Sequence, residues 1–134
     1  MEFKEFDYNQ YFEEIKGIFK SANWSAYLKD DEKLKRSFKN SIYLLCAFEQ
    51  NKLIGFIRCL GDGEHIVIVQ DLIVDPNYYR QGIGTNLFKA VSEKYKDVRS
   101  FCLFTDIHDI RDNEFYKSLG MVKIEEREIV SYIR

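Results

Sequence analysis

The stretch Asp71-Leu-Ile-Val-Asp-Pro-Asn-Tyr-Tyr-Arg-Gln-Gly-Ile-Gly-Thr85 decides the fold. It begins at the end of an apolar run, residues 66–74, which is typical of a strand buried on both faces. Asp75-Pro76 ends that strand, because the residue before a proline prefers extended geometry. Gly82-Ile83-Gly84 then opens a run whose apolar residues recur at helical spacing as far as residue 95. The stretch therefore predicts a strand, a polar loop and a helix in direct succession.

The start of that expected helix has the properties of an anion site. The first N–H groups of a helix have no acceptor within it and lie at the positive end of its dipole. Gly82 and Gly84 carry no side chain that would keep a phosphate from the main chain, and Arg80 adds a positive charge beside them. The segment lacks the Gly-Lys-Ser/Thr ending of a P-loop and the third glycine of a Rossmann fingerprint. Two glycines that serve only close packing are the structural alternative.

Outward from this stretch, the pattern predicts an α/β (α+β) chain with a mixed, largely antiparallel central sheet flanked by helices. The expected strands are residues 3–6, 42–48, 53–60, 66–74, 101–105, 121–124 and 129–133. The expected helices are residues 11–19 after a cap at Asp7, residues 30–39, residues 82–95, and residues 113–119 before a C-cap at Gly120. We expect these elements to form a single domain over residues 1–134.

Composition argues against several classes of protein. Of 134 residues, 46% are hydrophobic and 31% charged, as in a globular domain. The 20 basic residues are spread among 22 acidic ones, which argues against a dedicated nucleic-acid-binding protein. No apolar run is long enough for a membrane span, and the first residues do not resemble a secretory signal. Cys46, Cys59 and Cys102 are widely spaced, which favours reduced thiols in a cytoplasmic protein and no metal site.

Two segments resemble the GNAT superfamily of N-acetyltransferases. Residues 74–88 are similar to the family's acetyl-CoA-binding motif, Gln/Arg-x-x-Gly-x-Gly/Ala after an apolar strand. Residues 115–121, Phe-Tyr-Lys-Ser-Leu-Gly-Met, are similar to its Phe-Tyr-x-x-x-Gly-Phe segment. The two motifs occur in the family's order, and the expected fold has the family's two helices after the first strand. This sequence departs from the pattern at the first motif position, which is Tyr79, and at Met121 in place of Phe.

The resemblance implies direct transfer of an acetyl group from acetyl-CoA to an amine, with no metal. It implies that the pyrophosphate lies on the N–H groups of residues 81–85 and that the pantetheine arm pairs like an extra strand with residues 72–74. The residues expected to contact the cofactor are Leu72, Ile73, Val74, Tyr79, Arg80, Gln81, Gly82, Ile83, Gly84, Thr85 and Asn113.

The resemblance also assigns chemistry to Tyr116, which matches the tyrosine that hydrogen-bonds or protonates the leaving thiolate. A thiol of pKa about 8.5 and a phenol of about 10 make full proton transfer uphill by about 2 kcal/mol, so we expect Tyr116 mainly to orient the sulfur. Asp71, inside an apolar strand, is the candidate base, although a carboxyl needs desolvation or a water relay to accept a proton from an ammonium. A structural role for Asp71 stays open, and His65 and His108 are alternative bases.

The resemblance further implies that the first two helices and their connection line the acceptor side. Trp24 and Tyr27 lie there and could hold an arylalkylamine, a polyamine, or a peptide or protein amine, although they could equally be core residues. The alternative function is a GNAT-like domain that binds CoA without catalysis, which Tyr79 favours. A homodimer through residues 122–133 is also possible, because that segment is apolar and alternating and small family members often pair there.

Overall fold

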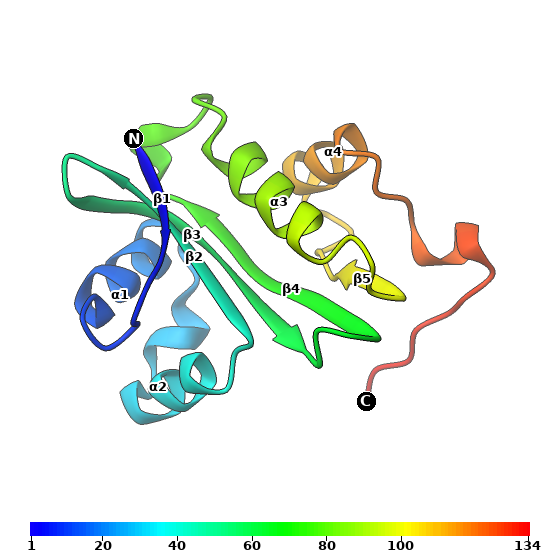
Figure 1. Ribbon diagram of the computed structural model, residues 1–134, viewed down its shortest axis with the longest axis horizontal. Coiled ribbons are helices and arrows are strands. Elements are labelled where there is room, and N and C mark those ends of the chain that lie inside the picture. The colour runs from blue at the N-terminus through cyan, green and yellow to red at the C-terminus, as the bar shows by residue number, and fades with distance from the viewer. The chain divides into compact units, whose positions relative to one another are not determined.

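A five-stranded sheet organises the first part of the chain in the computed structural model, which describes residues 1–134 (Figure 1). The strands follow one another in the order β1-β2-β3-β4-β5; β1 to β4 are antiparallel and β5 runs parallel to β4. Their bounds are Glu2–Glu5, Tyr43–Glu49, Lys52–Gly61, Ile66–Val74 and Ser100–Leu103. The mixed, largely antiparallel sheet predicted from the sequence is confirmed.

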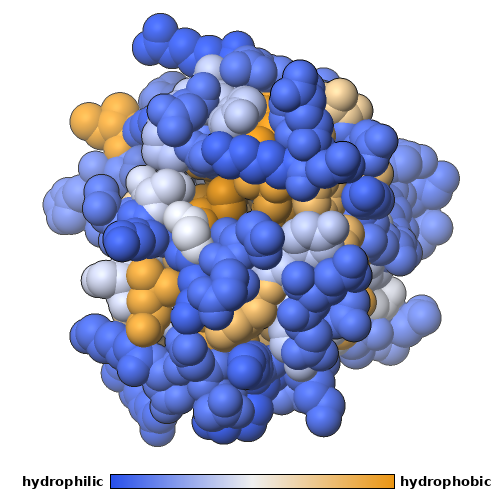
Figure 2. Space-filling model, turned by 90° about the vertical axis from the view of Figure 1, so that its left-hand side faces the viewer, coloured by the Kyte–Doolittle hydropathy of each residue, from blue (hydrophilic) through white to orange (hydrophobic).

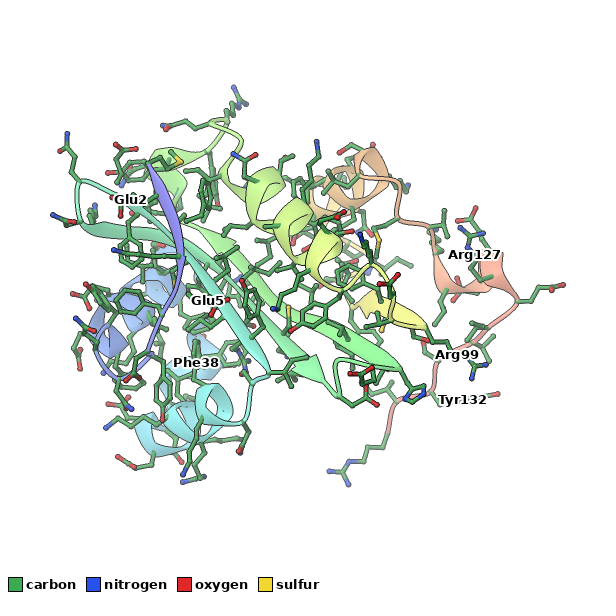
Figure 3. The ribbon with its side chains drawn as sticks, viewed as in Figure 1. Glu2, Glu5, Phe38, Arg99, Arg127 and Tyr132 are labelled. Atoms are coloured by element: carbon green, nitrogen blue, oxygen red, sulfur yellow. The ribbon has the colours of Figure 1, made fainter.

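Helices cover both faces of this sheet. Figure 1 shows α1 (Phe12–Ser21) and α2 (Asp31–Lys39) on one face and α3 (Ile83–Lys94) on the other. The core against α1 and α2 is rich in aromatic rings, with Phe38 of α2, labelled in Figure 3, packed on Phe56 of β3. The core against α3 is mainly aliphatic. The surface seen in Figure 2 is mostly hydrophilic, with hydrophobic residues showing in patches between polar ones.

A β-bulge in β4 redirects its side chains. Arg58 of β3 pairs with Asp71 and Cys59 pairs with Val69, so Gln70 has no partner on β3. Before the bulge Val69 packs in the α3 core, whereas after it Ile73 packs in the α1–α2 core. One extra residue therefore turns Asp71 toward the α1–α2 face and leaves Gln70 exposed.

The chain forms two compact units, residues 1–103 and residues 104–134, and the prediction of one domain stays a prediction. The second unit holds α4 (Ile110–Ser118), which ends in a Schellman motif: Gly120 has φ of 86°, and the N–H groups of Gly120 and Met121 donate to the carbonyls of Lys117 and Tyr116. The predicted cap at Gly120 is confirmed. No helix in the structure is both long enough and apolar enough to cross a bilayer.

Three sequence predictions about elements are wrong. The strands expected at residues 121–124 and 129–133 are absent; a 3-10 helix, Ile124–Arg127, and irregular chain take their place. Most of the apolar side chains there are exposed, among them Val122, Ile129, Val130 and Ile133, and an isolated pair of strands is marginal in water. Asp7 does not cap α1, because its carboxylate accepts the N–H of Asn9 in a turn and the helix begins only at Phe12.

Candidate active site

The parallel ladder between β4 and β5 stops halfway along β4. Its last pair is Val69 with Leu103, and the bulge at Gln70 follows. From Leu72 to Val74 the strand still pairs with β3 on one side, but β5 no longer accompanies it on the other. Unpaired main-chain donors and acceptors along such an edge can bind an extended, amide-containing chain as an added strand. The family resemblance predicts that the pantetheine arm binds at these residues.

The amino-terminal end of α3 follows after a loop, residues 75–82, and has no side-chain cap. Its N-cap residue is Gly82 in the left-handed conformation, with φ of 76° and no side-chain cap. The N–H groups of Ile83, Gly84 and Thr85 are the first of the helix and have no acceptor inside it. Every other α-helix of the chain has an acidic residue in its first turn, whereas α3 has none. The positive end of this helix dipole is therefore left for an external anion.

The loop between β4 and α3 is shaped by its own hydrogen bonds. The N–H of Asp75 donates to the carbonyl of Ile54 at 2.8 Å, and its carboxylate accepts the N–H of Asn77 at 2.9 Å. Arg80 adopts a left-handed φ of 66°, and its side chain and that of Gln81 are exposed. Tyr79 is half-buried and extended. The loop thus holds the end of β4 and exposes a cation near the start of α3.

The space in front of Gly82 is open. A Cβ built at Gly82 would meet no atom within 4 Å. The glycine is therefore not required by close packing of neighbouring protein atoms. Its positive φ and the free space together leave the main chain at the start of α3 accessible.

In the second unit, Asn113 organises the loop before α4. Its Oδ1 accepts from the Thr105 hydroxyl at 3.0 Å, and its Nδ2 donates to the carbonyls of Asp106 and Asp109 at 2.9 and 2.7 Å. The amide is thus already engaged within the loop. The structure gives Asn113 a positioning role, and the cofactor contact expected from the sequence stays a prediction.

Tyr116, on α4, is half-buried. Burial, followed by the carboxylates of Asp112 and Asp109, raises the pKa of its phenol above the ordinary value. A phenol with a raised pKa keeps its proton and is a weaker acid, but it remains a hydrogen-bond donor. The environment of Tyr116 supports orienting a sulfur more than protonating it.

The two aromatic residues expected at the acceptor side come together. The ring of Tyr27 stacks on Phe19 with centroids 4.6 Å apart, and Trp24 stacks on Tyr27 at 6.0 Å. Both Trp24 and Tyr27 are half-buried, so each has an exposed part as well as a packed one. The hydroxyl of Tyr27 accepts a hydrogen bond from Nε2 of Gln70 at 3.1 Å, which links this cluster to the bulge of β4.

Asp71 forms a buried ion pair that the sequence analysis missed. Nε of Arg58 donates to Oδ2 of Asp71, and the exposed fractions of the two side chains are 3% and 0%. Nη1 of Arg58 donates to Oγ of Ser41 at 3.0 Å and to the carbonyl of Ser37 at 3.3 Å. Burial raises the pKa of Asp71 despite the arginine. The signal in the sequence was a single cation within the apolar run 53–60, which needed the strand register to find its partner.

The two histidines expected as alternative bases, and the buried cysteines, are less suited to catalysis. The side chain of His65 is 81% exposed and lies in the turn before β4, at the opposite end from Leu72–Val74. His108 is exposed. Burial raises the pKa of Cys46 and Cys59 to about 12, so neither is a ready thiolate nucleophile. No group of three or more His, Cys, Asp or Glu side chains is placed to hold a metal ion.

Comparison with known proteins decides the family. The model of the acetyltransferase (GNAT) family matches residues 8–121. The chain belongs to the GNAT family. A GNAT-family acetyltransferase from Streptococcus pneumoniae TIGR4 has a TM-score of 0.82 and 28% identity, covering 99% of this chain and 94% of that one. The aminoglycoside N-acetyltransferase AAC(6')-Iy, solved with CoA, has a TM-score of 0.71 over 99% of this chain and 98% of its own, but at 18% identity it shows only the fold.

Curated GNAT relatives are longer than this chain. A protein named as the uncharacterized N-acetyltransferase ycf52 of Gracilaria tenuistipitata var. liui is 32% identical over an alignment of 97 positions that covers 68% of this chain and 52% of that protein. A ycf52-like protein of Prochlorococcus marinus is 28% identical over an alignment of 113 positions that covers 80% of this chain and 60% of that protein. The chain therefore spans about half the length of the curated relatives it matches. The resemblance found in the sequence is confirmed at the level of the family.

Proposed function

We propose that the chain is an acetyl-CoA-dependent N-acetyltransferase that acts on a primary amine. The observation that carries the proposal is the uncapped start of α3, with Gly82 as N-cap, directly after a β4 edge that β5 leaves unpaired. The two features suit the two parts of one ligand, an anionic pyrophosphate and an amide-containing arm. Membership of the GNAT family supports this assignment.

The chain's own groups would hold acetyl-CoA as follows. The N–H groups of residues 81–85 bind the pyrophosphate, and Arg80 adds charge beside it. Main-chain groups of residues 72–74 pair with the pantetheine arm, and one of these N–H groups polarises the thioester carbonyl. Tyr79 has a phenol where most family members have Gln or Arg. Main-chain N–H groups therefore make a larger share of the contacts to the pyrophosphate than side chains do. Acetyl-CoA supplies the activated acetyl group.

The leaving-group chemistry is assigned to Tyr116, as the family resemblance implies. Tyr116 donates a hydrogen bond to the developing thiolate, and Asn113 holds the loop before α4. Because the pKa of Tyr116 is raised, its phenol stays protonated through the working range of pH. The hydrogen bond strengthens as charge builds on the sulfur, which favours the transition state over the bound substrate.

The amine is expected to bind at Trp24 and Tyr27. The faces of aromatic rings attract cations, and a primary amine is an ammonium at neutral pH. The half-exposed stack of the two rings suits an arylalkylamine, a polyamine, or the amine of a peptide or protein. The buried Asp71 is a candidate for accepting its proton.

Acetyl-CoA is expected to stabilise the fold. A ligand at one hundred times its dissociation constant adds about 2.7 kcal/mol to the free energy of unfolding. For a chain of this size we expect the melting temperature to rise by about 5 to 10 °C. Differential scanning fluorimetry with millimolar acetyl-CoA measures the shift, and adenosine at the same concentration is the control. An unchanged melting temperature at low and moderate salt would contradict the proposed site.

We also propose that the chain forms a homodimer through its last residues. Ile129, Val130, Tyr132 and Ile133 are 52% to 98% exposed, and Figure 3 shows Tyr132 on this segment. A run of exposed apolar side chains is typical of an interaction surface. Ile133→Asp should convert a dimer to a monomer in size-exclusion chromatography with light scattering, whereas Ser131→Asp, also exposed, should have a smaller effect. A wild-type monomer at high concentration would refute the dimer.

The cysteines and the net charge support two further proposals, about the compartment and about the acceptor. The three cysteines are unpaired, which supports a reducing compartment such as the cytoplasm. The net charge of −2 supports an acceptor that is not nucleic acid.

A further inference from the structure

Asp71 is a carboxylate that a bound amine cannot touch. Its side chain has no exposed surface, and Arg58 occupies one of its oxygens. The other oxygen, Oδ1, is buried and accepts no hydrogen bond. A buried acceptor without a donor costs free energy, so such an atom in a native site calls for a reason. If Asp71 takes a proton from the acceptor, the proton must arrive through another group.

Tyr27 is the group in position to deliver it. Its ring lies near Arg58, the partner of Asp71, with Cζ of Arg58 6.0 Å from the ring centroid. The nearby Asp71 carboxylate adds to the effect of burial in raising the pKa of the phenol. The same hydroxyl accepts from Nε2 of Gln70 at 3.1 Å, and Gln70 is exposed at the bulge of β4. Because the amide of Gln70 uses a lone pair of the oxygen, the hydroxyl proton is free to turn toward the Asp71 carboxylate, whose Oδ1 has no other donor. Tyr27 thus connects the exposed side of β4 with the buried carboxylate.

Packing and hydrogen bonds restrict the side chains of both Tyr27 and Asp71. Stacking on Phe19 of α1 fixes the ring of Tyr27. Arg58 of β3 lies over the ring of Phe38 of α2, with Cζ 4.8 Å from its centroid, and fixes the carboxylate. The charged and titratable groups that face Asp71 are Arg58 and Tyr27, and those that face Tyr27 are Asp71 and Arg58.

We infer that Tyr27 is a proton relay between the acceptor amine and Asp71, an inference that rests on the proposed acetyl transfer. An N–H bond of the ammonium breaks and its proton goes to Oη of Tyr27, while the hydroxyl proton goes to Oδ1 of Asp71. The freed nitrogen lone pair forms the bond to the acetyl carbon as the carbon–sulfur bond breaks. A second nitrogen proton ends on the CoA sulfur, and Asp71 returns its proton to solvent by the same path. The ligand class is a cationic primary amine.

Tyr27→Phe tests the relay, because it keeps the ring and removes the hydroxyl. We expect kcat for a primary amine to fall about 10- to 100-fold at pH 7, with KM for the amine within about twofold. The deficit should shrink to within about threefold near pH 10, where the amine arrives already deprotonated. Tyr11→Phe is the matched control, since Tyr11 is half-buried against the same aromatic core. It should leave the pH profile unchanged.

The outcomes separate the relay from the proposed function. If the wild type acetylates no amine and shows no melting shift with acetyl-CoA, the proposed function fails. If the wild type is active and Tyr27→Phe matches it, or shows the same deficit at every pH, the relay is overturned. If Tyr27→Phe does not fold, Gln70→Leu at the exposed bulge provides the test instead. A kcat that falls about threefold at pH 7 and recovers near pH 10 supports the relay. An unchanged kcat contradicts it.

Discussion

Gly82→Val should raise the dissociation constant for acetyl-CoA at least about 100-fold while the chain remains folded. The space in front of Gly82 is open, so a branched side chain fills the volume that the proposed phosphate needs. It also covers the N–H groups at the start of α3, so that they can no longer donate hydrogen bonds to the phosphate. Isothermal titration calorimetry with acetyl-CoA measures the change. Arg80→Ala should weaken binding only about fivefold, since an exposed charge is screened by salt.

Gly63→Val is the matched control for this prediction. Gly63 has the same φ of 76°, and its only close neighbour would be Cε1 of Tyr95 at 3.8 Å. A side chain in this conformation is strained by about 1 to 2 kcal/mol, so both variants should lose similar stability. Only Gly82→Val should lose affinity for acetyl-CoA. Equal loss of binding in both variants would show that strain, and not an occupied phosphate site, is responsible.

Tyr116→Phe should lower kcat about 10- to 1000-fold with little change in the affinity for acetyl-CoA. The variant keeps the ring but removes a donor whose hydrogen bond strengthens only as the sulfur becomes negative. Because the pKa of Tyr116 is raised, its ionisation should cause no fall in the wild-type rate below about pH 10. Steady-state kinetics against pH, on any amine that is accepted, measures both effects.

Tyr132→Phe controls for the loss of a phenol in the same unit, because Tyr132 is 94% exposed. It should leave kcat unchanged. A Tyr116→Phe enzyme with a rate within about twofold of the wild type would make Tyr116 a packing residue, as expected for a nearly isosteric change. That result would remove the catalytic role implied by the family resemblance.

The sequence predicted best where local pattern and chemistry coincide. The β4–loop–α3 stretch combines a continuous apolar run, a proline and two glycines, and each restricts the backbone within a few residues. The same holds for the Schellman turn at Gly120. These signals do not depend on distant partners, so they could be read without a structure.

Features that depend on distant partners were missed. The bulge at Gln70 exists only in the register with β3, and it alone turns Asp71 toward Arg58, 13 residues away in the sequence. The apolar alternation of residues 129–133 is typical of a strand, but no strand forms in the structure. Asp7 has the right side chain for a cap, yet a local turn with Asn9 uses it. At Gln70 the register with a neighbouring strand decided the structure, whereas at Asp7 one local structure was formed in place of another.

Acetyl transfer itself tests the central claim most directly. The purified chain is incubated with acetyl-CoA and a panel of primary amines, including arylalkylamines, polyamines and peptides with free amines. Released CoA thiol and acetylated product are measured together, and Gly82→Val serves as the negative control. We predict thiol release that depends on one class of amine, is matched one-to-one by acetylated product, and is lost in the variant. Binding of acetyl-CoA with no amine-dependent release would contradict the account and indicate a domain that binds CoA without catalysis.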